Sequence, residues 1–157
     1  MGEQNNTEEI KAYRGYNFVA YRLDGHSVIE LQIKNFNKKI DPKERIGSKL
    51  KNEFRKYFSE GIDSRLGGEY VEIDMVNVLK IDVAGNDSGF SALCYFSHKY
   101  NERRKKEQKE FDKLRLRNCQ PRVAEILKKI LPLENTFYME DYPIPEDVQQ
   151  RMMRIYQ

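Results

Sequence analysis

The alternation of apolar and polar residues predicts a β-hairpin over residues 16–34. Ile29, Leu31 and Ile33 share one face of its second strand and are separated by polar residues, which is the pattern of a half-buried strand. The segment that precedes this strand is rich in aromatic side chains, which favour strands. Between the two, Asp24-Gly25 readily adopts the positive φ angles of a tight hairpin turn.

A second hairpin is predicted over about 70–99. Segment 69–83 is long and rich in β-branched residues, and segment 90–98 is a short apolar run that would pair with it. The glycines and polar residues of 84–89 between them have the composition of a loop. We therefore expect both hairpins to contribute to one antiparallel sheet.

A helix is predicted over about 42–60. Asp41-Pro42-Lys43-Glu44 offers an N-cap, a proline for the first turn and a glutamate that could close a capping box. Ile46, Leu50 and Phe54 then recur at helical spacing. The lysines and arginines on the other sides of this helix are interpreted as a solvated surface.

Two more helices are predicted in the second half of the chain. Segment 121–131 begins with a proline and places its apolar residues at the spacing of one helix face. Segment 101–117 begins with ten residues that include no apolar side chain. Opposite charges four residues apart, such as Glu102 and Lys106, indicate a solvent-exposed helix there.

These elements predict an α+β fold in which two antiparallel β-hairpins form one sheet. The amphipathic helices 42–60 and 121–131 pack on the sheet, and the charged helix 101–117 projects from it. The predicted core contains Phe18, Ile29, Leu31, Ile33, Ile46, Leu50, Phe54, Ile73, Leu79, Ile81, Leu93, Val123, Ile126, Leu127 and Ile130.

The length of 157 residues indicates a single domain. We expect a polar N-terminal arm at 1–12, the domain itself at 13–132 and an acidic C-terminal tail at 133–157. Within the tail, a short helix is predicted to begin near Pro145. Ten tyrosines and eight phenylalanines argue against a wholly disordered chain.

Charge is distributed unevenly along the chain. The net formal charge is +3, whereas residues 99–129 alone hold twelve basic and five acidic residues. An acidic segment follows directly. A basic element of this kind attracts a polyanion or an acidic partner. Its candidate binding residues are Lys99, Arg103, Arg104, Lys105, Lys106, Lys109, Lys113, Arg115 and Arg117, with Tyr95 and Tyr100 as aromatic neighbours.

The sequence therefore favours a non-enzymatic binding protein whose basic segment, about 99–117, contacts nucleic acid or another acidic partner. The main alternative is a structural or adaptor subunit of a homo-oligomer, connected through its C-terminal tail. The candidate contacts of that assembly are Phe137, Tyr138, Tyr142, Ile144 and Met152.

Catalytic alternatives find less support. A metal-dependent nuclease would use Asp24 with Glu30 and Lys34, but Gln32, a weaker ligand, stands where a Glu-x-Lys motif has its carboxylate. A turn position also accounts fully for Asp24. Cys94 and His98 would lie about 13 Å apart in a strand, too far for one zinc ion. We predict no metal site and no cofactor.

Two cysteines, Cys94 and Cys119, are too few for a disulfide framework. No apolar run is long enough to span a membrane, and the first residues lack the apolar stretch of a signal peptide. The sequence therefore predicts a cytoplasmic protein with reduced thiols that does not enter a membrane.

Overall fold

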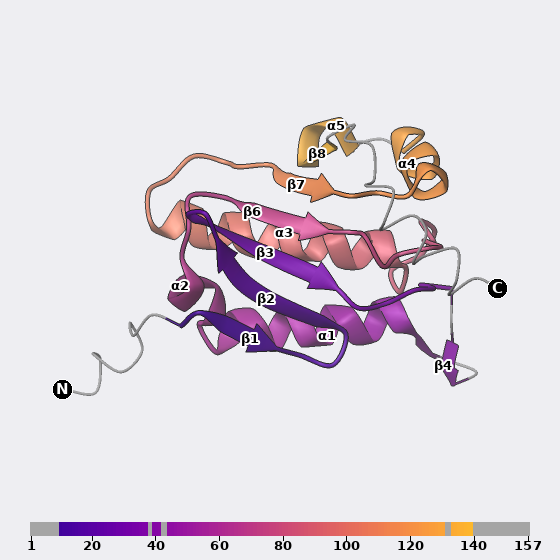
Figure 1. Cartoon of the computed structure of the whole chain (residues 1–157), viewed down its shortest axis with the longest axis horizontal. Coiled ribbons are helices and arrows are strands. Elements are labelled where there is room, and N and C mark those ends of the chain that lie inside the picture. The colour runs from indigo at the N-terminus through magenta and orange to yellow at the C-terminus, as the bar shows by residue number, and fades with distance from the viewer. Residues whose placement is uncertain (1–9, 38, 42–43, 131–132, 140–157) are drawn as a thin grey trace.

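The computed structural model describes residues 10–37, 39–41, 44–130 and 133–139. Its centre is a mixed six-stranded sheet in the order β1-β2-β3-β6-β7-β8 (Figure 1). β1 to β3 are antiparallel neighbours, and β3, β6, β7 and β8 run parallel. The strands are β1 Ala12–Arg14, β2 Phe18–Leu23, β3 His26–Leu31, β6 Val71–Asp74, β7 Leu114–Arg117 and β8 Phe137–Met139.

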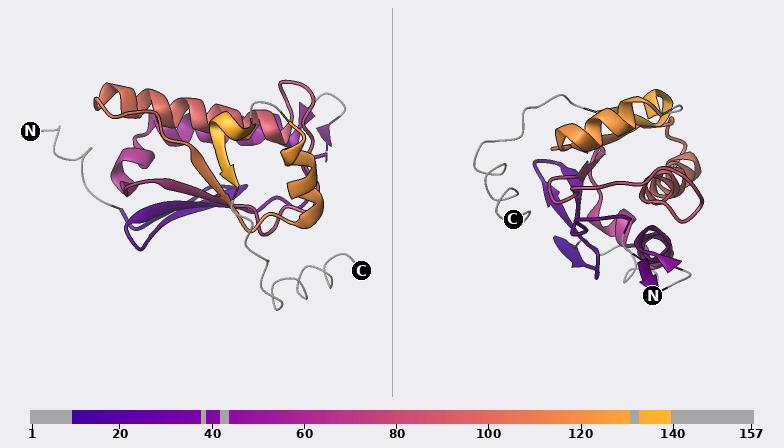
Figure 2. Two further views of the ribbon diagram at one scale, coloured as in Figure 1. Left: turned by 90° about the horizontal axis from the view of Figure 1, so that it is seen from above. Right: turned by 90° about the vertical axis from the view of Figure 1, so that its right-hand side faces the viewer.

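Two long helices, α1 (Ile46–Ser59) and α3 (Gly89–Lys106), lie side by side on one face of the sheet (Figure 2). Each is part of a connection between parallel strands, which cannot be joined by a tight turn. α2 (Ile62–Leu66) follows α1. The remaining short elements are the ribbon β4 (Lys39–Asp41) and β5 (Glu44–Arg45), and the helices α4 (Pro121–Lys128) and α5 (Leu133–Thr136) between β7 and β8.

The first predicted hairpin is present as β2 and β3, joined at Asp24-Gly25. Both turn residues have positive φ angles, 48° and 84°. These angles match the right-handed twist of the two flanking strands. Core residues alternate along both strands as the sequence predicts, with Phe18 and Ala20 facing the helices from β2, and Ile29 and Leu31 from β3.

The second predicted hairpin is wrong, because residues 90–98 belong to α3. Ser88 is the N-cap of this helix, and its hydroxyl accepts a hydrogen bond from the Ser91 amide at 3.0 Å. Leu93, Phe96 and Tyr100 then face the core at intervals of three and four residues. The other apolar residues of segment 90–98 concealed this helical spacing. Without a strand at 90–98 to pair with, β6 pairs with β3 and β7.

The predicted projecting helix 101–117 is also wrong. α3 ends at Lys106, the chain reverses near Gln108, and residues 114–117 form β7 inside the sheet. The predicted N-terminus of helix 42–60 is wrong as well, since Glu44 lies in β5 and α1 begins at Ile46. Arg45 occupies the N-cap position without a side-chain capping bond, so the predicted capping box does not start this helix.

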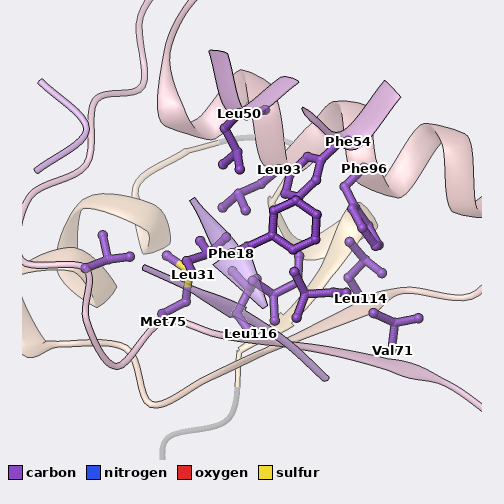
Figure 3. Close-up of a cluster of buried hydrophobic side chains, with 14 of the residues drawn as sticks. Phe18, Leu31, Leu50, Phe54, Val71, Met75, Leu93, Phe96, Leu114 and Leu116 are labelled. Carbon is purple, nitrogen blue, oxygen red and sulfur yellow. The ribbon is translucent and has the colours of Figure 1, made fainter. Parts of the chain in front are cut away.

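The hydrophobic core lies between the sheet and the pair α1–α3 (Figure 3). Its centre is aromatic: the ring centroids of Phe18 and Phe54 lie 5.1 Å apart, and those of Phe54 and Phe96 lie 4.9 Å apart. Most predicted core residues are buried, whereas Ile126 is 39% exposed. The buried ones are Phe18, Ile29, Leu31, Ile33, Leu50, Phe54, Ile73, Ile81, Leu93, Val123 and Leu127.

The part of the chain described beyond residue 132 also belongs to this fold. β8 pairs with β7, and Leu133 and Phe137 join the core. The rest of the expected tail, including the helix predicted near Pro145, lies outside the described residues. Among the residues that the structure describes, no helix combines the length and apolar character needed to cross a membrane.

The close approach of α1 to the start of α3 generates a stability prediction. A Cβ atom at Gly47, in the first turn of α1, would overlap the backbone of Asp87 and Ser88. We expect Gly47→Ala to lower the free energy of unfolding by about 1–3 kcal/mol, although alanine is the better helix former. Lys49→Ala, on the exposed side of the same helix, is the control. Urea denaturation measures both, and a Gly47→Ala protein as stable as the wild type would contradict this packing.

Candidate nucleic-acid interface

The structure divides the predicted basic segment between two sides of the molecule. Lys99, Arg103, Arg104, Lys105 and Lys106 belong to the second half of α3. Arg115 and Arg117 alternate with the buried Leu114 and Leu116 in β7, so they lie on the sheet face that is turned away from the helices. Lys113 immediately precedes this strand, and Lys109 lies in the connection.

On the helical side, three cations surround the ring of Tyr95. Lys51 Nζ lies 5.9 Å from the ring centroid, the Arg55 guanidinium carbon 5.7 Å and Lys99 Nζ 5.8 Å. Lys51 and Arg55 come from α1, whereas Tyr95 and Lys99 come from α3. We call these four residues the Tyr95 cluster. Cations so close to an aromatic face are attracted by its quadrupole, which holds the four side chains together.

The α1 members of the Tyr95 cluster were missed at the sequence level, where Lys51 and Arg55 counted among solvated charges. Residues four apart lie on the same side of a helix, as Lys51 and Arg55 do on one helix and Tyr95 and Lys99 on another. Such spacing says nothing about which helices adjoin. The sequence alone carried no signal that the two faces adjoin. Their proximity depends on α1 and α3 packing side by side.

A cavity of about 290 Å³ adjoins the Tyr95 cluster. It shares Arg55 and Lys99 with the cluster and extends toward α2. Its lining residues are Arg55, Phe58, Ser59, Asp63, Ser64, Lys99, Glu102, Arg103 and Lys106. The cluster and the cavity together form a basic surface along α1 and α3, which we call the α1–α3 face.

Arg103 contributes to the fold rather than to the exposed charge of this face. Its Nε donates to the carboxylate of Asp63, a residue that is only 2% exposed, and its Nη1 lies 2.8 Å from Glu107 Oε2. Burial raises the pKa of the Asp63 carboxyl, although Arg103 opposes that shift. A buried carboxylate is costly without a cation beside it. Arg103 is therefore held by Asp63, and the pair links α3 to α2.

Arg104 and Tyr100 likewise serve the fold. The Tyr100 hydroxyl donates to Asp112 Oδ2 at 2.8 Å, and Arg104 Nε donates to the Glu110 carbonyl at 2.8 Å. The Tyr100 ring is buried, and its burial and the Asp112 carboxylate raise the pKa of its hydroxyl. These bonds anchor the connection between α3 and β7, so Tyr100 offers no ring face to a ligand.

On the opposite sheet face, the predicted cations have partners within the chain. Arg117 Nη1 lies 3.2 Å from Glu72 Oε2, and Lys113 Nζ lies 4.9 Å from the centroid of the Tyr138 ring. The Arg115 guanidinium lies 3.6 Å from the centroid of the Tyr70 ring, which stacks on His26. This sheet face is thus separate from the α1–α3 face. Arg117 has an ion pair there, whereas Lys113 and Arg115 contact tyrosine rings.

The residues considered for assembly are dispersed. Phe137 is 3% exposed in the core of its own chain, and Tyr138 is half exposed on β8. Tyr142, Ile144 and Met152 lie beyond the described part of the chain. Among the described members, only Tyr138 is therefore available at the surface for a contact between copies.

The residues weighed for a nuclease are not brought together. Asp24 lies in the hairpin turn, whereas Glu30 lies about 13 Å along β3 from the first residue of that strand, His26. Cys94 and His98 lie on α3 rather than in a strand, so the distance argument against a shared zinc does not apply to them. In the described ranges, no group of three or more His, Cys, Asp and Glu side chains could hold a metal ion.

The two cysteines lack the environment of a nucleophile. Burial raises the pKa of the Cys94 thiol to about 11 and that of the Cys119 thiol to about 12. A pKa above neutrality keeps both thiols protonated at physiological pH, and the thiolate is the reactive form.

No protein-family model matches the chain, and neither the curated proteins nor the solved structures provide a match. What the protein does is therefore inferred from the side chains that the fold assembles.

The buried pair leads to a prediction about Arg103. We expect Arg103→Met to lower the free energy of unfolding by about 3–5 kcal/mol, because it leaves the Asp63 carboxylate buried without a cation. Lys106→Met, on the exposed surface of the same helix, should change it by less than ~0.5 kcal/mol. Replacing both partners, Arg103→Met with Asp63→Leu, should recover much of the loss. If Arg103→Met and Lys106→Met unfold at the same urea concentration, the Arg103–Asp63 pair does not stabilise the fold.

Proposed function

We propose that the protein is a non-enzymatic binding protein that contacts nucleic acid through the α1–α3 face. The observation that carries the proposal is the Tyr95 cluster, where three cations from two helices surround one aromatic ring. Lysine and arginine neutralise phosphates, and a tyrosine ring can stack on an unpaired base. The combination suits a single strand better than a duplex, whose bases are already stacked.

The charges around the cluster support this proposal. Arg55 forms no ion pair with a described carboxylate; its guanidinium donates to Asn52 Oδ1 at 2.9 Å. Lys51 donates to the Asn86 carbonyl and to Ser91 Oγ, neither of which is charged. Lys99 lies 3.3 Å from Glu102 Oε2, a pair that is exposed and weak in water. Arg55 and Lys99 can therefore turn to a polyanion at little cost, whereas Lys51 also joins α1 to the start of α3 through its two bonds.

The proposal differs from the sequence-level hypothesis in its residues. Lys51 and Arg55 are added, while Arg103, Arg104 and Tyr100 are assigned to the fold. Replacing the basic residues 103–106 together would consequently mix a loss of binding with a loss of stability. A better test replaces cations, such as Arg55 and Lys99, that do not compensate a buried carboxylate.

The first binding prediction concerns Arg55→Ala with Lys99→Ala. Measured by fluorescence anisotropy, this double variant should bind a labelled single-stranded oligonucleotide more weakly than the wild type. The slope of log K against log salt should fall by about 1 to 2, because two phosphate contacts are lost. Arg122→Ala with Lys129→Ala, two exposed positions beside or within α4, removes the same charge and is the control.

Two results would overturn the proposal. If both double variants weaken binding equally, only the net charge matters and the α1–α3 face is not the binding surface. If poly-glutamate competes as well as the oligonucleotide does, the partner is an acidic protein surface rather than nucleic acid. The melting temperature of each variant confirms that it is folded.

The second binding prediction concerns the Tyr95 ring. Tyr95→Leu keeps the cations and removes the stacking surface, so it should weaken single-strand binding about tenfold while changing duplex binding little. Tyr95 is partly buried against the core, whereas Tyr138 on β8 is half exposed and also contacts a lysine. Tyr138→Leu should leave both affinities unchanged. An unchanged single-strand affinity in Tyr95→Leu would show that the ring only holds the cations in place.

A further inference from the structure

α2 lies near the end of α1 and the second half of α3 (Figure 1). The residues that line the cavity beside the Tyr95 cluster come from these three helices. Its floor and rim can be told apart by burial. The Asp63 side chain is 3% exposed and the Arg103 side chain 20%, so their pair forms the floor. Arg55, Glu102 and Lys106 are exposed and form the rim. A ligand therefore meets the exposed rim residues first and the buried pair last.

The charges of the cavity are only partly neutralised. Asp63 is paired with Arg103 at the floor. Glu102 is shared between Lys99 at 3.3 Å and His98 at 3.1 Å. Arg55 and Lys106 form no ion pair with a carboxylate among the described residues. Two rim cations therefore remain to attract an anion, and they complement a group that carries two negative charges.

A hydroxyl group adds a hydrogen-bond donor to these cations. Ser59 and Ser64 both line the cavity, but the Ser59 hydroxyl already donates to the Lys56 carbonyl at 3.1 Å. Ser64 Oγ has no hydrogen-bond partner in the described part of the chain and is exposed, so it can donate to an anionic oxygen. The volume of about 290 Å³ is at the lower end for a ligand pocket. It suits a phosphate with part of its sugar rather than a larger ligand.

We infer that this cavity binds the terminal phosphate monoester of a nucleic-acid strand or of a nucleotide, an inference that rests on the proposed function. A monoester carries about two negative charges near neutral pH and offers three oxygens, whereas a diester within a strand carries one charge and continues on both sides. The Tyr95 cluster shares Arg55 and Lys99 with the cavity. When the terminal phosphate occupies the cavity, the adjoining nucleotide of a bound strand would lie at the Tyr95 cluster.

The test compares three single-stranded oligonucleotides of one sequence: with a 5′-phosphate, with a 3′-phosphate and with hydroxyl groups at both ends. Anisotropy titrations of the wild-type chain should show about tenfold tighter binding of one phosphorylated strand than of the unphosphorylated strand. Lys106→Ala should abolish that preference, and its affinity for the unphosphorylated strand should fall only as far as that of Lys105→Ala, which removes the same charge. Lys105→Ala, its neighbour on α3, does not line the cavity and should keep the preference.

Each outcome separates this inference from the proposed function. Equal binding of all three strands by the wild type would overturn the inference and leave nucleic-acid binding intact. Equal loss of the preference in Lys106→Ala and Lys105→Ala would also overturn it. Failure of every strand to bind would instead overturn the proposed function. A nucleoside monophosphate that displaces the phosphorylated strand supports the cavity and identifies a nucleotide as a sufficient ligand.

Discussion

The packing of α1 against α3 is the interaction on which the rest of the structure depends. Phe54 and Tyr57 from α1 meet Phe96 from α3, with ring centroids 4.9 and 5.9 Å apart, directly above Phe18 of the sheet (Figure 3). Buried aromatic side chains contribute more apolar area than other residues, and their edge-to-face contacts fix the relative position of the helices. At the start of α1, Gly47 allows the backbone preceding α3 to approach closely.

This packing also explains how a basic surface arises from two distant segments. With the aromatic residues turned inward, Lys51 and Arg55 of α1 and Tyr95 and Lys99 of α3 are turned toward one another at the outer side of the helix pair. The Tyr95 cluster is thus a consequence of the core. Any change that separates the two helices would also separate the cations from the ring.

The chain uses part of its positive charge to fold. Arg103 compensates a buried carboxylate on α2, Arg104 holds the connection after α3, and Arg117 contacts Glu72 across the sheet. A net charge counted along the sequence therefore overstates the charge that a ligand meets. The positions that remain available are set largely by tertiary contacts, because the pairs of Arg103 with Asp63 and of Arg117 with Glu72 join residues that are distant in the chain.

Local signals predicted the local structure. The period-two pattern and Asp24-Gly25 were sufficient for the β2–β3 hairpin, and Pro121 marked the start of α4. The strand prediction for segment 90–98 failed because a short, mostly apolar run fits a buried strand as well as a helix. Ser88 was a capping signal that could have decided for the helix. Parallel pairing of β3, β6 and β7 is non-local and left no trace in the sequence. For the same reason Tyr95 and Lys99 were predicted as binding residues, whereas Lys51 and Arg55 were not.

We propose that the α1–α3 face, and not the opposite sheet face, meets nucleic acid. Backbone amide chemical shifts of the labelled protein, followed while a single-stranded oligonucleotide is added, distinguish the two faces. We expect the shifts to concentrate around Lys51–Phe58 of α1 and Tyr95–Lys106 of α3. Shifts that concentrate instead on Tyr70, Glu72, Arg115 and Arg117 would contradict it.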